Sequence, residues 1–224
     1  MRKATLVSTL YDALLDRLLS NQLKPGEKIN LDRLRAELGV SISPLREAVS
    51  RLTGTRLIQF EDQRGYTVSE VSLVDFHEVM EICRNSECFA LTRAIEQGDL
   101  QWESDITAAL YRLRNTEANL RSPEWEIAHR DFHRTLVSAC KMPRIHAIIE
   151  QIAIAQRRYR GLIDAHALSD RSADHIQLAE AALARDAERG CEIMRQHISS
   201  VEQEMTLLLH GYFERESAGD IAAQ

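Results

Sequence analysis

A short segment near the N-terminus, residues 30–53, limits the fold of this chain more than any other part of its sequence. Asn30 is a suitable N-cap for a short helix, and Gly39 is a suitable residue to end that helix. Ser43 and Pro44 then predict the start of a second helix, because proline is favoured at the first helical position. Two helices joined by a tight glycine-containing turn form the helix-turn-helix pattern.

The residues on either side of this pattern extend it into a domain. Leucines at near-helical spacing predict a helix over residues 5–20. Residues 57–60 and 66–71 carry β-forming side chains, and the polar connector at 61–65 ends in a glycine, which predicts a β-hairpin. We therefore expect a winged helix-turn-helix domain over residues 1–71.

In such a domain the second helix of the motif lies in the DNA major groove, and the wing reaches the neighbouring backbone. Arginine suits guanine edges and phosphates, and serine hydroxyls near a helix start suit phosphate. Each arginine alone is equally consistent with a solvated helix face, so DNA binding is predicted from the whole pattern. The candidate DNA contacts are Arg46, Arg51, Ser41, Ser43, Arg64 and Gly65.

Charge is distributed unevenly along the chain, whose net charge is −6. Residues 1–71 carry 11 basic and 9 acidic side chains, whereas residues 72–224 carry 17 basic and 25 acidic ones. This difference is consistent with an N-terminal part that meets a polyanion and a C-terminal part that does not.

Residues 72–224 predict an all-α antiparallel bundle, so the fold class is mainly α. The whole chain has only nine glycines and four prolines, which argues against a β-sandwich or barrel and for long helices. Caps and apolar spacing predict helices over about residues 72–97, 100–120, 122–141, 143–167, 172–184 and 186–210.

Cysteine usage and hydropathy bear on the compartment. The four cysteines form no C-x-x-C pair, and no secretory signal or apolar run of about 18 residues is present. We therefore expect a cytoplasmic protein with reduced thiols and no membrane association.

Four of the eight histidines form a pattern. His129 and His133 are four residues apart and share one helix face, while His175 and His197 belong to two other predicted helices. Inward side chains of facing helices can converge in a bundle, and four imidazoles suit a borderline transition metal. A single helical histidine is more often a surface or hydrogen-bonded residue, and this alternative stays open for each of them.

The run from Gly39 to Val49, supported by Leu23–Gly26 and Arg64–Val68, resembles the DNA-binding domain of the GntR family. The resemblance implies a homodimer on a palindromic double-stranded operator, with repression as the commoner mode. Ile42 stands where the family usually has arginine, so one common base or phosphate contact is expected to change.

The remainder resembles the FCD ligand-binding domain of the FadR subfamily. His129–His133 resembles its D-x-x-F-H motif, and Asp174-His175 and residues 184–197 resemble its other two histidine motifs. The resemblance implies that His133, His175 and His197 bind a metal. His129 replaces the usual aspartate, so a site of four histidines is expected, with zinc or nickel as the metal.

FCD domains bind small carboxylates, and the resemblance implies that an arginine helps to hold the acid. The family's arginine lies four residues before a glutamate, but counting back from Glu87 gives Cys83, with Arg84 one step away. Arg130, Arg134 and Arg158 are further candidates, each better explained as a surface salt-bridge partner. The candidate effector contacts are Arg84, Arg130, Arg134 and Arg158.

These patterns together predict a homodimeric transcription repressor controlled by a small organic acid. One alternative keeps the DNA-binding domain but makes the bundle a dimerisation scaffold without a ligand. The other is a helical metalloenzyme, since H-x-x-x-H is also a zinc-protease pattern. Arg130 stands where that chemistry needs a basic glutamate, and arginine cannot accept a proton at neutral pH, so no enzyme is expected.

Overall fold

The computed structural model describes residues 5–116 and 122–222 of the chain. These form two compact units. The first comprises Met1–Phe76 together with Ile154–Ile163, and the second comprises His77–Ala153 and Asp164–Gln224. This division differs from the boundary predicted at residue 71, because a later segment, Ile154–Ile163, packs with the N-terminal unit.

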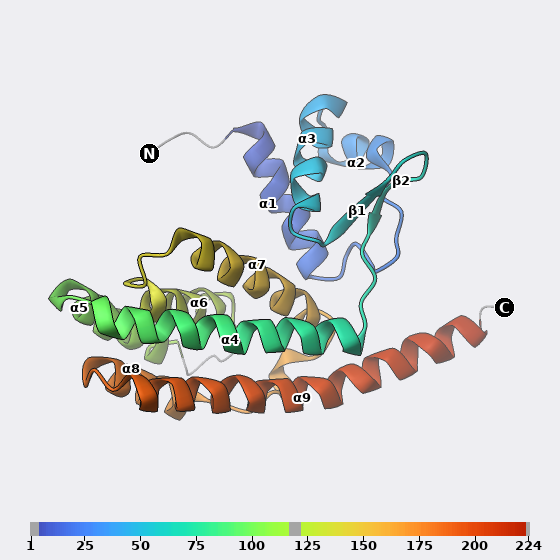
Figure 1. The fold of residues 1–224 in the computed structure, drawn as a ribbon. Coiled ribbons are helices and arrows are strands. Elements are labelled where there is room, and N and C mark those ends of the chain that lie inside the picture. Colours follow the sequence, from blue (N-terminus) through green and yellow to red (C-terminus); the bar gives the residue numbers. More distant parts are fainter. Residues whose placement is uncertain (1–4, 117–121, 223–224) are drawn as a thin grey trace. The chain divides into compact units, whose positions relative to one another are not determined.

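The first unit is a winged helix-turn-helix domain, as predicted (Figure 1). Its antiparallel strands pair from Ile58 opposite Val68 to Glu61 opposite Gly65. The leucine face of the first helix packs against the third helix, and Leu14, Leu45 and Leu52 are at most 1% exposed. Its elements are α1 (Leu6–Leu19), α2 (Leu31–Leu38), α3 (Ile42–Thr53), β1 (Ile58–Glu61) and β2 (Gly65–Val68).

Local capping explains where the helices of the motif begin and end. The Asn30 side chain accepts a hydrogen bond from the Arg33 amide, and Gly39 ends α2 in the left-handed region at φ 64°. The prediction that α3 begins at Pro44 is wrong, because the helix begins two residues earlier with Ser41 as its N-cap. Proline is accepted within the first turn because an amide there has no partner inside the helix.

The second unit is a helical bundle, which confirms the mainly α fold class. Within it α5 packs against α6 and α8, and α8 packs against α9. Its side chains with essentially no exposure include Leu91, Ile106, Phe132, Leu178 and Met194. The remaining helices of the described residues are α4 (Leu73–Gln97), α5 (Leu100–Arg114), α6 (Pro123–Val137), α7 (Pro143–Arg160), α8 (Ser172–Leu183), α9 (Ala187–Ala222) and the short 3-10 helix η2 (Ala165–Ala167).

The predicted and observed helices differ most at their ends. The ends of α5, α6 and α7 come earlier than the predicted residues 120, 141 and 167, whereas α9 continues past residue 210. Part of the predicted end of α5 lies outside the described residues. Helix α7 ends at Arg160, and at the following Gly161 a Cβ atom would lie 1.9 Å from the Leu19 carbonyl oxygen. That close approach comes from tertiary packing.

Helices α4 and α9 lie side by side (Figure 1). Gly190 allows the close approach, since a Cβ atom there would lie 3.3 Å from a methyl carbon of Ile95. In the described part of the chain, no helix combines the length and the hydropathy needed to span a membrane.

Candidate functional site

The start of α3 is an exposed, positively charged surface of the first unit. Ser41, Ser43 and Arg46 are all exposed there. The Ser41 side chain makes no capping hydrogen bond. Uncapped amides, a helix dipole and two hydroxyl groups form a surface suited to phosphate, and the Arg46 guanidinium lies one turn further along.

The wing contributes Arg64 and Gly65. Gly65 has φ 84°, a conformation that other residues adopt with strain. The Arg64 side chain is 80% exposed and lies 3.0 Å from the Glu61 carboxylate, a surface pair weak enough to exchange for a phosphate. Arg46, Arg64 and Gly65 line one concavity. Arg51 is placed differently, because its guanidinium lies 5.2 Å from the centre of the Tyr11 ring on α1.

Three helices of the second unit bring four histidines together. His129 and His133 come from α6, His175 from α8 and His197 from α9. Each offers a ring nitrogen, and these atoms all lie within 4.8 Å of one another. The ring centres are 4.6 Å apart for His129 and His133 and 5.1 Å apart for His175 and His197.

Apolar and aromatic groups surround this cluster. His175 and His197 are 3% and 5% exposed. Trp125 stacks on the His129 ring at 4.5 Å, and the Phe132 ring lies 5.5 Å from the His175 ring. These contacts help to hold the imidazoles within the cluster.

Asp174 orients one member of the cluster. Its carboxylate lies 3.0 Å from Nδ1 of His197. The hydrogen bond with His197 lowers the pKa of the Asp174 carboxyl below its ordinary value, and the His197 charge adds to this effect. An Nδ1–H group that donates to Asp174 leaves Nε2 of His197 with a lone pair that can bind a metal.

The donor set fits a transition metal. Zinc binds imidazole nitrogen at about 2.0–2.1 Å, which places tetrahedral nitrogens about 3.4 Å apart. The largest separation here, 4.8 Å, exceeds that value by an amount that side-chain rotation can close. Four neutral nitrogen donors suit zinc, nickel or copper and are a poor match for magnesium or calcium.

Comparison with known proteins places both units in one family. The model of the gntR family of bacterial regulatory proteins matches residues 6–68, and the model of the FCD domain matches residues 78–200. The chain belongs to the GntR family of bacterial transcription regulators. It is therefore a DNA-binding regulator and not an enzyme.

Three relatives of this GntR regulator illustrate the similarity. The uncharacterised regulator BphR of Paraburkholderia xenovorans is 32% identical, over 88% of this chain and 83% of its own length. The transcriptional repressor GlaR of Escherichia coli is 30% identical, over 84% and 90%. The structure of Escherichia coli McbR/YncC has a TM-score of 0.72 at 24% identity, covers 90% of this chain and 99% of its own, and supports the fold.

Three of the four candidate effector arginines, Arg84, Arg134 and Arg158, bind protein groups. Arg84 donates to Glu202 at 2.9 Å and to the Ser199 hydroxyl at 3.0 Å. Arg158 is buried in the first unit and donates to the Ser69 carbonyl oxygen. It therefore belongs to a different compact unit from the histidines.

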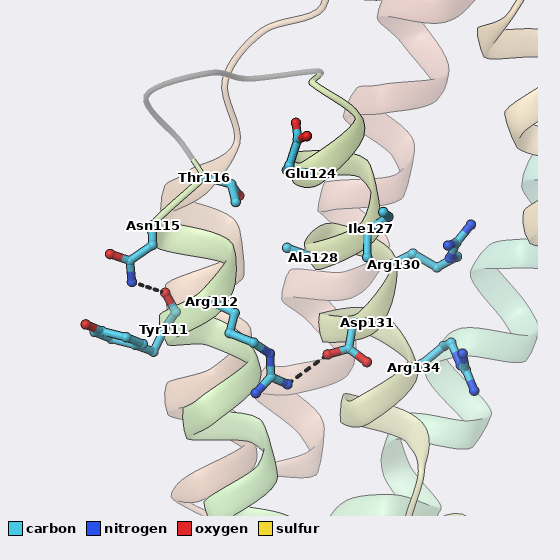
Figure 2. A pocket seen from close by; sticks show the side chains of 10 residues that line it. All are labelled: Tyr111, Arg112, Asn115, Thr116, Glu124, Ile127, Ala128, Arg130, Asp131 and Arg134. Atoms are coloured by element: carbon cyan, nitrogen blue, oxygen red, sulfur yellow. Dashed lines mark hydrogen bonds and ion pairs between the residues drawn. The ribbon is translucent and has the colours of Figure 1, made fainter. Parts of the chain in front are cut away.

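The other two candidates lie on an open groove of about 810 Å³ between α5 and α6. Arg134 pairs with Glu150 at 2.9 Å. In Figure 2, Arg130 and Arg134 point to one side of α6, while Asp131 points to the other and meets Arg112 at 2.8 Å. The structure therefore does not gather the four candidate arginines around one binding site.

Sequence reasoning missed Glu87, a carboxyl group inside the second unit. Glu87 is only 8% exposed, and within the described part of the chain its Oε2 atom has no hydrogen-bond partner. Burial, with a smaller effect from the Glu150 charge, raises the pKa of Glu87 to about 8. The sequence analysis used Glu87 only as a reference point for the family's arginine, and only the folded bundle shows that its carboxyl group is buried.

Proposed function

We propose that this GntR regulator is a homodimeric repressor that binds a palindromic operator. A small organic acid controls this binding, and a metal in the second unit is needed to hold the acid. Ring nitrogens of His129, His133, His175 and His197 within 4.8 Å of one another carry this proposal. The relative named GlaR is a repressor, which supports the same direction of control.

The charge of the site favours an acid as the effector. Four imidazoles bring no negative charge to a divalent cation. A metal held here with five or six ligands, rather than as a closed tetrahedral site, would keep a position to which an anion is strongly attracted. A divalent metal held by the four histidines would supply Lewis-acid attraction for a carboxylate. Arg84 and Arg134 already pair with protein carboxylates, so the metal is the main anchor in this proposal.

Exposed apolar side chains on α4 support the homodimer. Ile82 is 37% and Phe89 42% exposed, and residues seven apart lie on one side of a helix. A second copy of the chain could cover both. Two winged helix-turn-helix domains related by a two-fold axis would then match the two half-sites of a palindromic operator.

Metal analysis of protein purified without an affinity tag tests the proposal. We expect one zinc or nickel ion per chain, retained after gel filtration, and a dimer mass by light scattering. Changing His133 and His175 to alanine is expected to remove the metal. His210→Ala, an exposed histidine on α9, is the matched control and should retain it.

An effector screen completes the test. With the metal bound, at least one mono- or dicarboxylate is expected to raise the melting temperature, and a chelator should abolish that shift. Protein without metal that no acid stabilises would instead support the alternative in which the bundle is only a dimerisation scaffold.

A further inference from the structure

A concavity of about 590 Å³ lies on the winged helix-turn-helix unit, between the starts of α2 and α3 and the wing. Lys28, Arg46 and Arg64 bring positive charge to its lining, against the acid Asp32. A positively charged concavity beside α3, the helix expected to enter the major groove, attracts the phosphates of a DNA duplex.

Apolar side chains share this concavity with the cations. Ile42, the first residue of α3, lines it together with Phe60 on the wing. Phe60 is 55% exposed, and its ring lies 4.9 Å from the Tyr66 ring. Ile42 is half-buried, so part of its side chain remains open to a ligand.

Ile42 and Arg46 are four residues apart and therefore project from the same face of α3. Arg46 is exposed, and among the described residues it has no ion-pair partner. A duplex that meets Arg46 in this concavity also meets Ile42. Isoleucine has no hydrogen-bonding group, so it cannot read a donor or acceptor pattern or neutralise a phosphate.

The major groove offers an aliphatic side chain one apolar partner, the C5 methyl group of thymine. We propose that Ile42 is a specificity-determining residue that selects a thymine near the base contacted by Arg46, through contact with that methyl group. This inference rests on operator binding by the winged head. It goes beyond operator binding by naming thymine as the base that Ile42 selects.

The test uses the full-length protein and DNA sites selected from a random duplex library. Each thymine of the selected site is replaced in turn by uracil, which lacks only the methyl group, and the dissociation constant is measured at fixed salt. At one thymine per half-site we expect uracil to weaken binding about fourfold, the value for one buried methyl-sized group. Replacement in both half-sites should weaken it about sixteenfold.

Variants connect the effect to Ile42. Ile42→Ala should bind the thymine and uracil duplexes equally, and Ile42→Val should retain part of the difference. A new selection with Ile42→Arg should shift the preferred base at that position towards guanine. Melting curves on each variant check that the head remains folded, and Phe60→Ala should keep the methyl effect.

Each contrary result is informative. A selected site in which no thymine is sensitive to its methyl group overturns the role of Ile42. The same holds if the sensitivity survives in Ile42→Ala or is lost in Phe60→Ala. A selection that recovers no preferred sequence contradicts operator recognition itself and is therefore distinguishable from failure of this inference.

Discussion

At the scale of single residues, Glu87 shows what burial does to an ionisable group. Its raised pKa means that the folded protein keeps a proton on Glu87 at pH values where the unfolded chain has lost it. Between the ordinary value of 4.5 and about 8, the folded state binds more protons, so the free energy of unfolding falls as pH rises. At about 1.4 kcal/mol per pKa unit, the full effect is of the order of a few kcal/mol.

Glu87→Gln keeps the shape of the side chain and removes the titration. We expect the variant to gain stability over the natural protein as pH rises from about 5 to 8, because only the natural protein loses stability from this group. Thermal unfolding at both pH values, with the metal content held constant, measures the difference. Glu81→Gln, at an exposed position of α4, is the control, and equal pH profiles for all three proteins would contradict the assignment.

At the scale of elements, α7 contributes to both compact units. Its last turns, from Ile154 onwards, belong to the first unit, and Tyr159 there is only 1% exposed. The Tyr159 hydroxyl donates to the Ser72 carbonyl oxygen at 3.1 Å and also reaches the Asp75 carboxylate. Burial, together with the bond to Asp75, raises the pKa of Tyr159, so the hydroxyl stays protonated and remains a donor.

Tyr159→Phe removes this hydroxyl while keeping the ring contact with Phe76 at 5.2 Å. We expect a loss of about 1–2 kcal/mol, since polar partners at the start of α4 lose a hydrogen bond. In a chain of this length that corresponds to a fall in melting temperature of about 2–8 °C, measured by calorimetry. Tyr111→Phe, at a site 70% exposed, should change nothing, and an equal loss in both variants would argue against the bond.

At the scale of the whole molecule, the uneven charge distribution has a functional consequence. The more basic N-terminal part contains the exposed arginines of the reading surface, while the remainder carries most of the net negative charge. Binding to DNA should therefore weaken steeply with salt, by about 0.9 in the logarithmic slope for each phosphate neutralised. An effector that controls operator binding needs a coupling free energy of only about 1–3 kcal/mol between the effector site and the two DNA-binding domains.

Arg64→Ala tests this electrostatic contribution. We expect the slope of log K against log salt to fall by about 1 for each head, because one phosphate contact is lost. The slope comes from titrations of one selected duplex at several salt concentrations. Arg112→Ala removes an exposed arginine that pairs with Asp131 in the bundle, and it should leave the slope unchanged. If both variants keep the natural slope, Arg64 does not contact the backbone.

The predictions that agreed with the structure rest on interactions within a few residues. Asn30 caps the start of α2 and Gly39 ends it, as expected, because an N-cap and a left-handed glycine affect only the helix next to them. The beginning of α3 was misplaced, since Ser41 and Ser43 are both acceptable caps and only the backbone conformation separates them. The end of α7 was misplaced, although Gly161, a residue type that often follows a helix, comes directly after its last residue.

The sequence by itself determined a helix-turn-helix with a wing, a helical remainder, and a pair of histidines one turn apart, because spacing along the chain sets all of these. The expected bundle packing and the resemblance to a family pointed to His175 and His197 as their companions, and tertiary structure brought the four rings together. Tertiary structure alone decided that Arg84 faces Glu202, that Glu87 is buried, and that Ile154–Ile163 packs with the N-terminal unit. These outcomes depend on which residues, distant in the sequence, are buried next to one another. The spacing of residues along the chain does not determine that.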